Sequence, residues 1–182
     1  MAHERTAGPA TALIPGEQPA SSCLVMTGTI GYSYLEWVDS GFYPPGTRSA
    51  AMLEFYGRSF SVVELNYTWY QMARSDVLTR MLAAAPAHVI FAAKLTRTVT
   101  HEREEDWREQ VQRYRQGISA RGKRLAAILV QLPPDFDRTV SNRRFLAELL
   151  EYLQGMPVAV EFRHASWAVD TVFDELERRQ IT

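Results

Sequence analysis

Five short runs of apolar, often β-branched residues recur along the sequence, and their starts are separated by roughly thirty residues, as in βα units. Runs of this length predict buried strands. They are CLVMTGT (23–29), SVVELNY (61–67), HVIFAAKL (88–95), AAILVQL (126–132) and PVAVEFR (157–163). Helix-like stretches separate them, among them a polar one over 103–121 and a last one near 169–180. This alternation predicts an α/β fold with a parallel sheet.

The exit of the first strand distinguishes between two α/β folds. A dinucleotide-binding fold places the pattern GxGxxG directly between its first strand and a helix. Here GTIGYSY lacks the full pattern, and FYPPG follows it where a helix would be needed. The sequence therefore favours a TIM-type barrel over a doubly wound sheet.

Alternate residues within the last four runs fall into two sets, which face opposite sides of the predicted sheet. One set is apolar and is expected to face helices: Val63, Leu65, Phe91, Ala93, Leu95, Ile128, Val130, Leu132, Val158, Val160 and Phe162. The other set becomes polar towards the carboxyl end of each run, where it contains Glu64, Asn66, Lys94, Gln131, Glu161 and Arg163. An α/β barrel would gather these polar residues at one mouth, where such barrels place their active sites.

Six motifs occur in the order expected of one known family: GTIGYSYLEW, FYPPG, VVELNYTWY, FAAKLTRTVTH, ILVQLPP and AVEFRHASW. Over about residues 24–168 the chain resembles the domain-of-unknown-function-72 family, also called YecE-like, and this resemblance implies a TIM-barrel fold. Ile30 and Tyr32 depart from the family pattern, in which a small residue and a tryptophan are expected. The resemblance implies a fold and a site at the strand exits, without a reaction.

The number of predicted strands limits how much of a barrel is present. A closed (β/α)8 barrel typically needs about 250 residues, whereas only five strands precede the final ERRQIT. We expect a flexible tail over 1–22 and one domain over 23–182, an incomplete barrel of about five βα units that is truncated relative to the family. Completion by a second copy and a different open architecture are the alternatives. The exposed edges of an unclosed sheet would permit self-association.

Composition narrows the classes of partner. The chain has 20 basic and 21 acidic residues, which gives no general argument for nucleic acid. The arginines of the segment 94–123 alternate with acids, so a solvated helix is expected there and nucleic acid is only weakly supported as a partner. A single cysteine, Cys23, and the absence of an apolar run of about 18 residues predict a cytoplasmic protein without a membrane span.

The candidate chemistry comes from the predicted mouth. Glu64 and Glu161 form a candidate acid/base pair, and the alternative is a structural network with Lys94 and Arg163. His101 and His164 are candidate proton carriers or metal ligands, but no HxH or HExxH spacing supports a metal. The predicted ligand-binding residues are Tyr34, Asn66, Tyr70, Lys94, Gln131, Arg163 and Trp167. No cofactor follows from these residues.

Three functions are compatible with this pattern. The leading hypothesis is a barrel that binds or transforms a small polar ligand, phosphorylated or sugar-containing, by acid/base chemistry. The second is a metal-dependent phosphodiester or nucleic-acid enzyme that uses the histidines and glutamates as ligands. The third is a non-catalytic binding or interaction module, which the unclosed sheet would favour.

Overall fold

The structure of the chain is a computed structural model that describes residues 25–182. The tail predicted over 1–22 lies outside these residues. The strands are β1 (Gly28–Ile30), β2 (Val62–Leu65), β3 (Ile90–Lys94), β4 (Leu125–Gln131) and β5 (Val158–Glu161). The helices are α1 (Glu36–Asp39), α2 (Ser49–Tyr56), α3 (Tyr67–Tyr70), α4 (Ser75–Ala84), α5 (Trp107–Ile118), α6 (Val140–Tyr152) and α7 (Asp170–Arg178). Three further short turns are η1 (Thr98–Glu102), η2 (Ser119–Arg124) and η3 (Ala165–Trp167).

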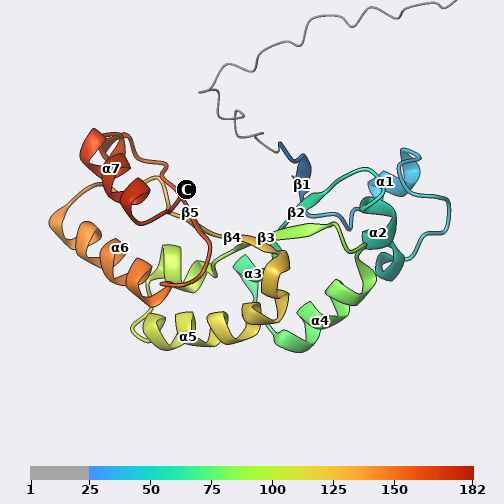
Figure 1. Ribbon diagram of the computed structural model, residues 1–182, viewed down its shortest axis with the longest axis horizontal. Helices are drawn as coiled ribbons and strands as arrows, with labels where there is room; N and C mark the ends of the chain where they lie inside the picture. The colour runs from blue at the N-terminus through green and yellow to red at the C-terminus, as the bar shows by residue number, and fades with distance from the viewer. Residues whose placement is uncertain (1–24) are drawn as a thin grey trace, which may run out of the picture.

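The strands form one parallel sheet in the order β1-β2-β3-β4-β5, so that every strand pairs with its neighbours in the sequence. A doubly wound sheet would reverse its order near the middle. The helices follow the sheet in an arc along its outer side, and the opposite, concave side faces the open part of this arc (Figure 1). The predicted α/β fold with about five units of a TIM-type barrel is therefore confirmed.

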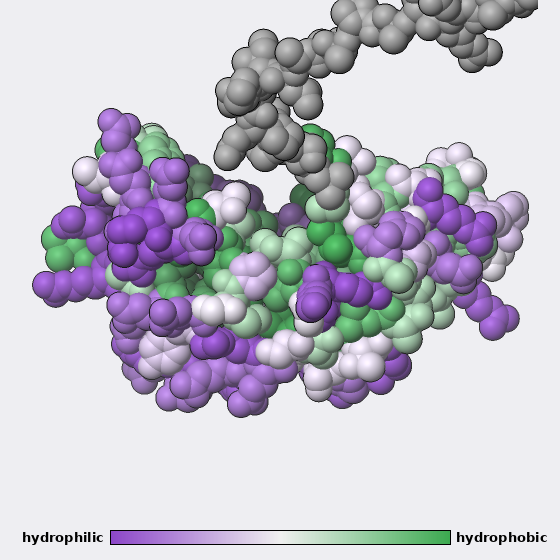
Figure 2. Space-filling view, viewed as in Figure 1, coloured by the Kyte–Doolittle hydropathy of each residue, from purple (hydrophilic) through white to green (hydrophobic). Residues whose placement is uncertain are grey.

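The core lies between the sheet and the arc of helices. Val63, Phe91 and Ile128 are fully buried on the outer face of the sheet, as the apolar alternation predicts. Their partners are apolar residues of the helices, including Met52, Leu78 and Leu149. On the concave face, Val62, Ile90 and Leu129 are only partly buried. Apolar residues are visible between two lobes whose outer surfaces are mainly hydrophilic (Figure 2).

The pairing of β3 with β4 contains an irregularity. Phe91 pairs with Leu125, whereas the next residue, Ala92, pairs with Ala127. Ala126 is therefore an extra residue in β4, and it is exposed. A bulge of this kind changes which residues of the two strands lie opposite each other.

Two predicted elements differ from the structure. The helix expected over 103–121 is shorter, α5 over Trp107–Ile118, because Arg103 adopts a left-handed conformation with φ 50° and ends η1 before α5 begins. Strand β1 is also shorter than the run 23–29, since residues 25–27 are exposed and form no strand. At the other edge, Thr182 exchanges backbone hydrogen bonds of 2.7 and 3.1 Å with Val160 and Val158 of β5.

Helix α5 packs closely against the backbone of Ala73 at Gly117. A Cβ atom at this position would lie 2.0 Å from the backbone oxygen of Ala73, too close for the helix to keep its place. Gly117→Ala is therefore expected to lower the free energy of unfolding by about 1–3 kcal/mol, although alanine is the better helix former. Urea denaturation measures this change, with Gln116→Ala on the exposed side of α5 as the control. A Gly117→Ala variant at least as stable as the wild type would contradict the close approach.

Candidate functional site

Two pairs of polar side chains lie on the concave face near the carboxyl ends of the strands. Lys94 of β3 reaches across to Glu64 of β2, with 3.3 Å between Nζ and Oε1. Gln131 of β4 donates from Nε2 to Glu161 Oε2 of β5 at 2.6 Å. Strand pairing accounts for the second contact, because Gln131 and Glu161 lie opposite each other in the parallel ladder.

Arg163 extends the second pair beyond the strand. Strand β5 ends at Glu161, two residues earlier than the predicted run, so Arg163 lies in the following loop. Its Nε nevertheless donates to Glu161 Oε1 at 2.7 Å. Both oxygens of Glu161 are thus bonded, one to a neutral amide and one to a guanidinium. Five of the predicted residues are brought together in this way: Glu64, Lys94, Gln131, Glu161 and Arg163.

The ionisation of Glu161 follows from these contacts. Burial acts to raise the pKa of its carboxyl group, but the hydrogen bonds from Gln131 and Arg163 and the charges of Arg163 and Lys94 outweigh burial and lower it. Glu161 is therefore an anion at neutral pH. Lys94 influences Glu161 from the neighbouring pair, so the two pairs share one electrostatic environment.

His101 lies within the same environment, in η1 after β3. Burial lowers the pKa of its imidazole, and the positive charges of Arg163 and Lys94 lower it further against the opposing charges of Asp135 and Glu102. The ring is therefore neutral at neutral pH. His101 Nδ1 lies 2.8 Å from Thr100 Oγ1, and the edge of the ring meets Trp69 at a centroid distance of 5.3 Å. The Nε2 atom is the nitrogen that this arrangement leaves for a ligand.

The structure gives His164 and Trp167 local structural contacts. His164 caps η3, since its Nδ1 accepts from the backbone N–H of Ser166. Trp167 is only 4 % exposed, stacks on Phe136 and Phe162, and donates from Nε1 to the carbonyl oxygen of Phe136 at 2.7 Å. Both residues also line a cavity of about 420 Å³ beside Arg163. Trp167 thus lines this cavity with its polar side-chain atom already bonded.

Tyr34 and Asn66 lie on the β1 side, and Tyr70 lies in α3. Asn66 leaves the strand alternation because β2 ends at Leu65 and Asn66 adopts a helical conformation at the start of α3. It lines a cavity of about 380 Å³ together with Tyr34, whose hydroxyl donates to the carbonyl oxygen of Ile30. Tyr70 is 65 % exposed and meets the Trp69 ring edge to face. None of these contacts involves Glu161 or Arg163.

Asp135 is a charged neighbour of His101 that the strand pattern did not predict. It follows β4 by four residues, after Pro133 and Pro134, so it lies outside the alternation that marks the other polar groups. Its position in a loop directly after a strand could have indicated a role at the site, since such loops carry functional residues in barrels.

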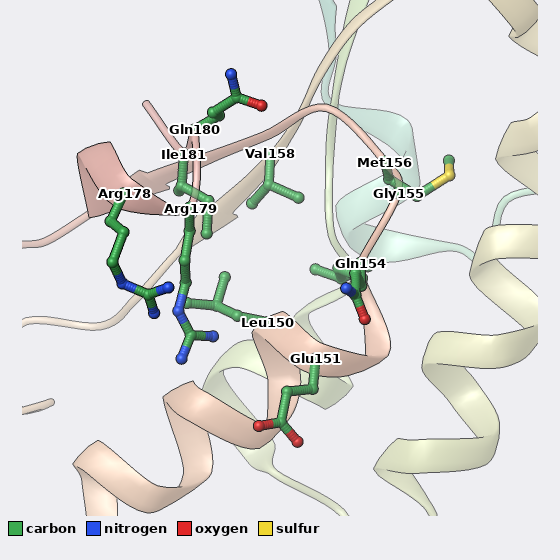
Figure 3. Close-up of a pocket in the computed structure, with 11 residues that line it drawn as sticks. Leu150, Glu151, Gln154, Gly155, Met156, Val158, Arg178, Arg179, Gln180 and Ile181 are labelled. Carbon is green, nitrogen blue, oxygen red and sulfur yellow. The ribbon is translucent and has the colours of Figure 1, made fainter. Parts of the chain in front are cut away.

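A hollow of about 580 Å³ lies at the opposite end of β5 (Figure 3). Its walls come from the end of α6, the loop before β5 and the residues after α7, and its arginines, Arg178 and Arg179, both bind Glu175. Val158, the first residue of β5, marks this as the amino-terminal end of the strand. That end of a barrel usually serves stability, so this hollow is separate from the candidate site.

Within residues 25–182, no group of three or more His, Cys, Asp or Glu side chains is arranged to hold a metal ion. The predicted metal-dependent alternative thus has no assembled ligand set in this region. None of the described helices combines the length and apolarity required to cross a membrane.

The strand order and the polar residues at the carboxyl ends define a TIM-barrel-type α/β protein. Residues 26–182 match the family described as "Protein of unknown function DUF72", and the chain belongs to this family. The resemblance seen in the sequence motifs is thereby confirmed.

Individual relatives support the same assignment. The UPF0759 protein YunF of Bacillus subtilis (strain 168) is 29 % identical over 139 residues, which cover 72 % of this chain and 49 % of that protein. The crystal structure of a DUF72 family protein from Thermotoga maritima MSB8 matches with a TM-score of 0.74 and 28 % identity, over 88 % of this chain and 64 % of the other. One from Enterococcus faecalis V583 has a TM-score of 0.70 at 17 % identity, over 85 % and 58 %. The chain spans about half the length of the Bacillus protein and less than two thirds of both solved chains.

Gln131→Met tests the electrostatics of Glu161. The substitution removes one hydrogen-bond donor while burial continues to oppose ionisation, so the pKa of Glu161 is expected to rise from its lowered value. Carbon-13 NMR of the glutamate carboxyl groups measures it, with Gln112→Met on the exposed face of α5 as the control.

The same variant changes how stability depends on pH. A lowered carboxyl pKa contributes stability that is present above the ordinary value of 4.5 and is lost as the pH falls through the folded value. Gln131→Met should reduce this contribution at neutral pH and shift its loss to higher pH. An unchanged Glu161 pKa in the variant would mean that Gln131 does not stabilise the carboxylate.

Proposed function

We propose that this chain binds a small polar ligand, bearing hydroxyl groups and an anionic group, at the carboxyl ends of β2 to β5. Lys94 and Arg163 would anchor the anionic group, and Glu161 would accept hydrogen bonds from hydroxyl groups. The observation that carries the proposal is the meeting of Gln131, Glu161 and Arg163 beside the pair of Lys94 and Glu64. Arginine and lysine provide the fork and the point charge that phosphate and carboxylate groups require.

The accessibility of these side chains supports binding over a purely structural network. Arg163 and Glu161 keep 43 % and 38 % of their side-chain surfaces exposed, whereas Lys94 and Glu64 keep 12 % and 22 %. The outer pair is thus the more accessible to a ligand, and Lys94 of the inner pair would attract the anionic group mainly through its charge. Trp69 beside His101, with Tyr70 against Trp69, supplies aromatic surface on which a sugar could pack.

The carboxylates and imidazoles of this site favour acid/base catalysis as the type of chemistry. We propose Glu64 and Glu161 as the acid/base pair, with His101 and His164 as auxiliary proton carriers. Because Glu161 is held as an anion, its part would be that of proton acceptor. The neutral ring of His101 has the protonation state that a second acceptor needs at neutral pH.

Glu161→Gln tests the proposed site. Sugar phosphates and their parent sugars would be compared for binding by saturation-transfer NMR and calorimetry. The substitution removes the charge that accepts hydrogen bonds, so the affinity of any ligand bound by the wild type should fall by about tenfold, the effect of one hydrogen bond to a charged group. Glu177→Gln, at an exposed position of α7, is the matched control. Equal binding by Glu161→Gln and the wild type would remove Glu161 from the site.

A second candidate function, self-association, is favoured by the exposure of the concave face. Ile30 of β1 lies opposite Glu64, hence on this face, and is 52 % exposed. Partly buried apolar residues of β2, β3 and β4 continue the surface. A second copy of this chain could cover it, because an apolar sheet face is stabilised when it is removed from water.

Ile30→Lys tests self-association. Sedimentation velocity of the wild type over a range of concentrations should show a dimer, and the charged side chain should shift the equilibrium to monomer. Val140→Lys is the control, since Val140 is 53 % exposed on α6, a helix of the outer layer. A wild type that stays monomeric at every concentration would contradict this second function.

A further inference from the structure

Arg121 is a buried arginine in the layer between the sheet and the helices, and no carboxylate of residues 25–182 forms an ion pair with it. It lies in η2 and is 2 % exposed. Its guanidinium carbon stands 3.8 Å from the centroid of the Phe91 ring. Nη2 contacts only the thioether sulfur of Met81 at 3.4 Å, and Nε and Nη1 have no hydrogen-bond partner among residues 25–182. A thioether is a weak acceptor, so the five donors of this side chain are almost entirely unsatisfied.

Arg124, three positions later in the same turn, shows the contrast. Its guanidinium donates to the carbonyl oxygens of Leu82, Val89 and Pro86 at 3.0, 2.9 and 2.8 Å. The fold therefore satisfies one arginine of η2 with backbone acceptors and leaves the other without them. Buried charges are normally paired or fully hydrogen-bonded, because an isolated one is costly to remove from water.

The groups around Arg121 do not neutralise it. Burial lowers the pKa of Arg121 to about 10, so the side chain remains a cation at neutral pH. The titratable groups that influence its pKa are Tyr67, Arg124, Tyr32 and Tyr114, and they include no carboxylate. Burial also raises the pKa of Tyr67 to about 12, which keeps its hydroxyl group protonated and able to donate. That hydroxyl, too, is buried and has no partner within the described residues.

A cavity lies beside Tyr67 and Met81, two neighbours of Arg121. It has a volume of about 380 Å³ and is formed by the loop after β1, the start of α3 and one side of α4. Two of its lining residues also neighbour Arg121: Met81 through the sulfur contact and Tyr67 through its electrostatic influence. Met81 has a flexible, unbranched side chain that can turn aside at little cost.

We propose that this cavity is an anion-binding site in which Arg121 and the hydroxyl of Tyr67 hold the charge. The anion reaches the guanidinium when the side chain of Met81 turns away. Its chemistry is that of a small inorganic anion or of the carboxylate or phosphate of a larger molecule that fills the cavity. The site is distinct from the Glu161 site, because Phe91 and Arg121 lie on the helix-covered side of the sheet.

Thermal unfolding at constant ionic strength tests the proposal. Sodium chloride, sodium phosphate or sodium acetate would replace sodium gluconate stepwise, and the unfolding temperature of the wild type should rise saturably with at least one of them. Arg121→Met should abolish this rise and weaken anion binding by at least about tenfold, the effect of losing a charged hydrogen-bond donor. Lys123→Met removes the same charge from an exposed position of the same turn and should leave the rise intact.

A direct measurement on the wild type covers the case in which Arg121→Met does not fold. Chloride-35 NMR should show line broadening by the protein that phosphate or acetate reverses, and Tyr67→Phe should reduce it. Saturable binding of chloride supports an inorganic occupant, and binding of phosphate or acetate in preference to chloride supports the ionised group of a larger ligand. No saturable response to any of the three anions, or an equal response in Arg121→Met, would overturn the proposal and leave buried water as the partner of Arg121.

Discussion

The structure depends on the pairing of parallel strands in sequence order. Parallel ladders keep paired residues on the same face, so a helix layer on one side obliges Val63, Phe91 and Ile128 to face it together. The residues between them must then face the concave side. That geometric requirement brings Gln131 and Glu161 within hydrogen-bonding distance, although 30 positions separate them in the chain.

Much of this could be predicted from the sequence, because strand alternation is a local property. The period of two placed Glu64, Lys94, Gln131 and Glu161 on one face without knowledge of any contact. The roles of individual side chains that depend on contacts between distant parts of the chain could not be predicted. Trp167 is of a residue type that often stacks on ligands. Its actual partner, Phe136, lies 31 positions earlier, and nothing in the sequence around residue 167 indicates that contact.

Local backbone conformation produced the other differences. Asn66 fits the strand alternation by position but turns into α3, so it lies with Tyr34 and not with Lys94. Arg103 carries no helix-breaking signal, yet its left-handed backbone ends the turn that contains His101. Its side chain donates to Asn142 of α6 and lies over Phe136, and these tertiary contacts favour a conformation that its local propensity does not.

The unpaired residue Ala126 explains why Gln131 of β4 lies on the same face of the sheet as Lys94 of β3. Before it, Leu125 faces the helices opposite Phe91; after it, Ala127 faces the concave side opposite Ala92. If Ala126 instead paired regularly with Ala92, every later position of β4 would reverse its orientation relative to β3. Gln131 would then point into the helix layer and Val130 would replace it beside Glu161. One unpaired alanine thus decides whether the fourth strand contributes an amide or a methyl group to the concave face.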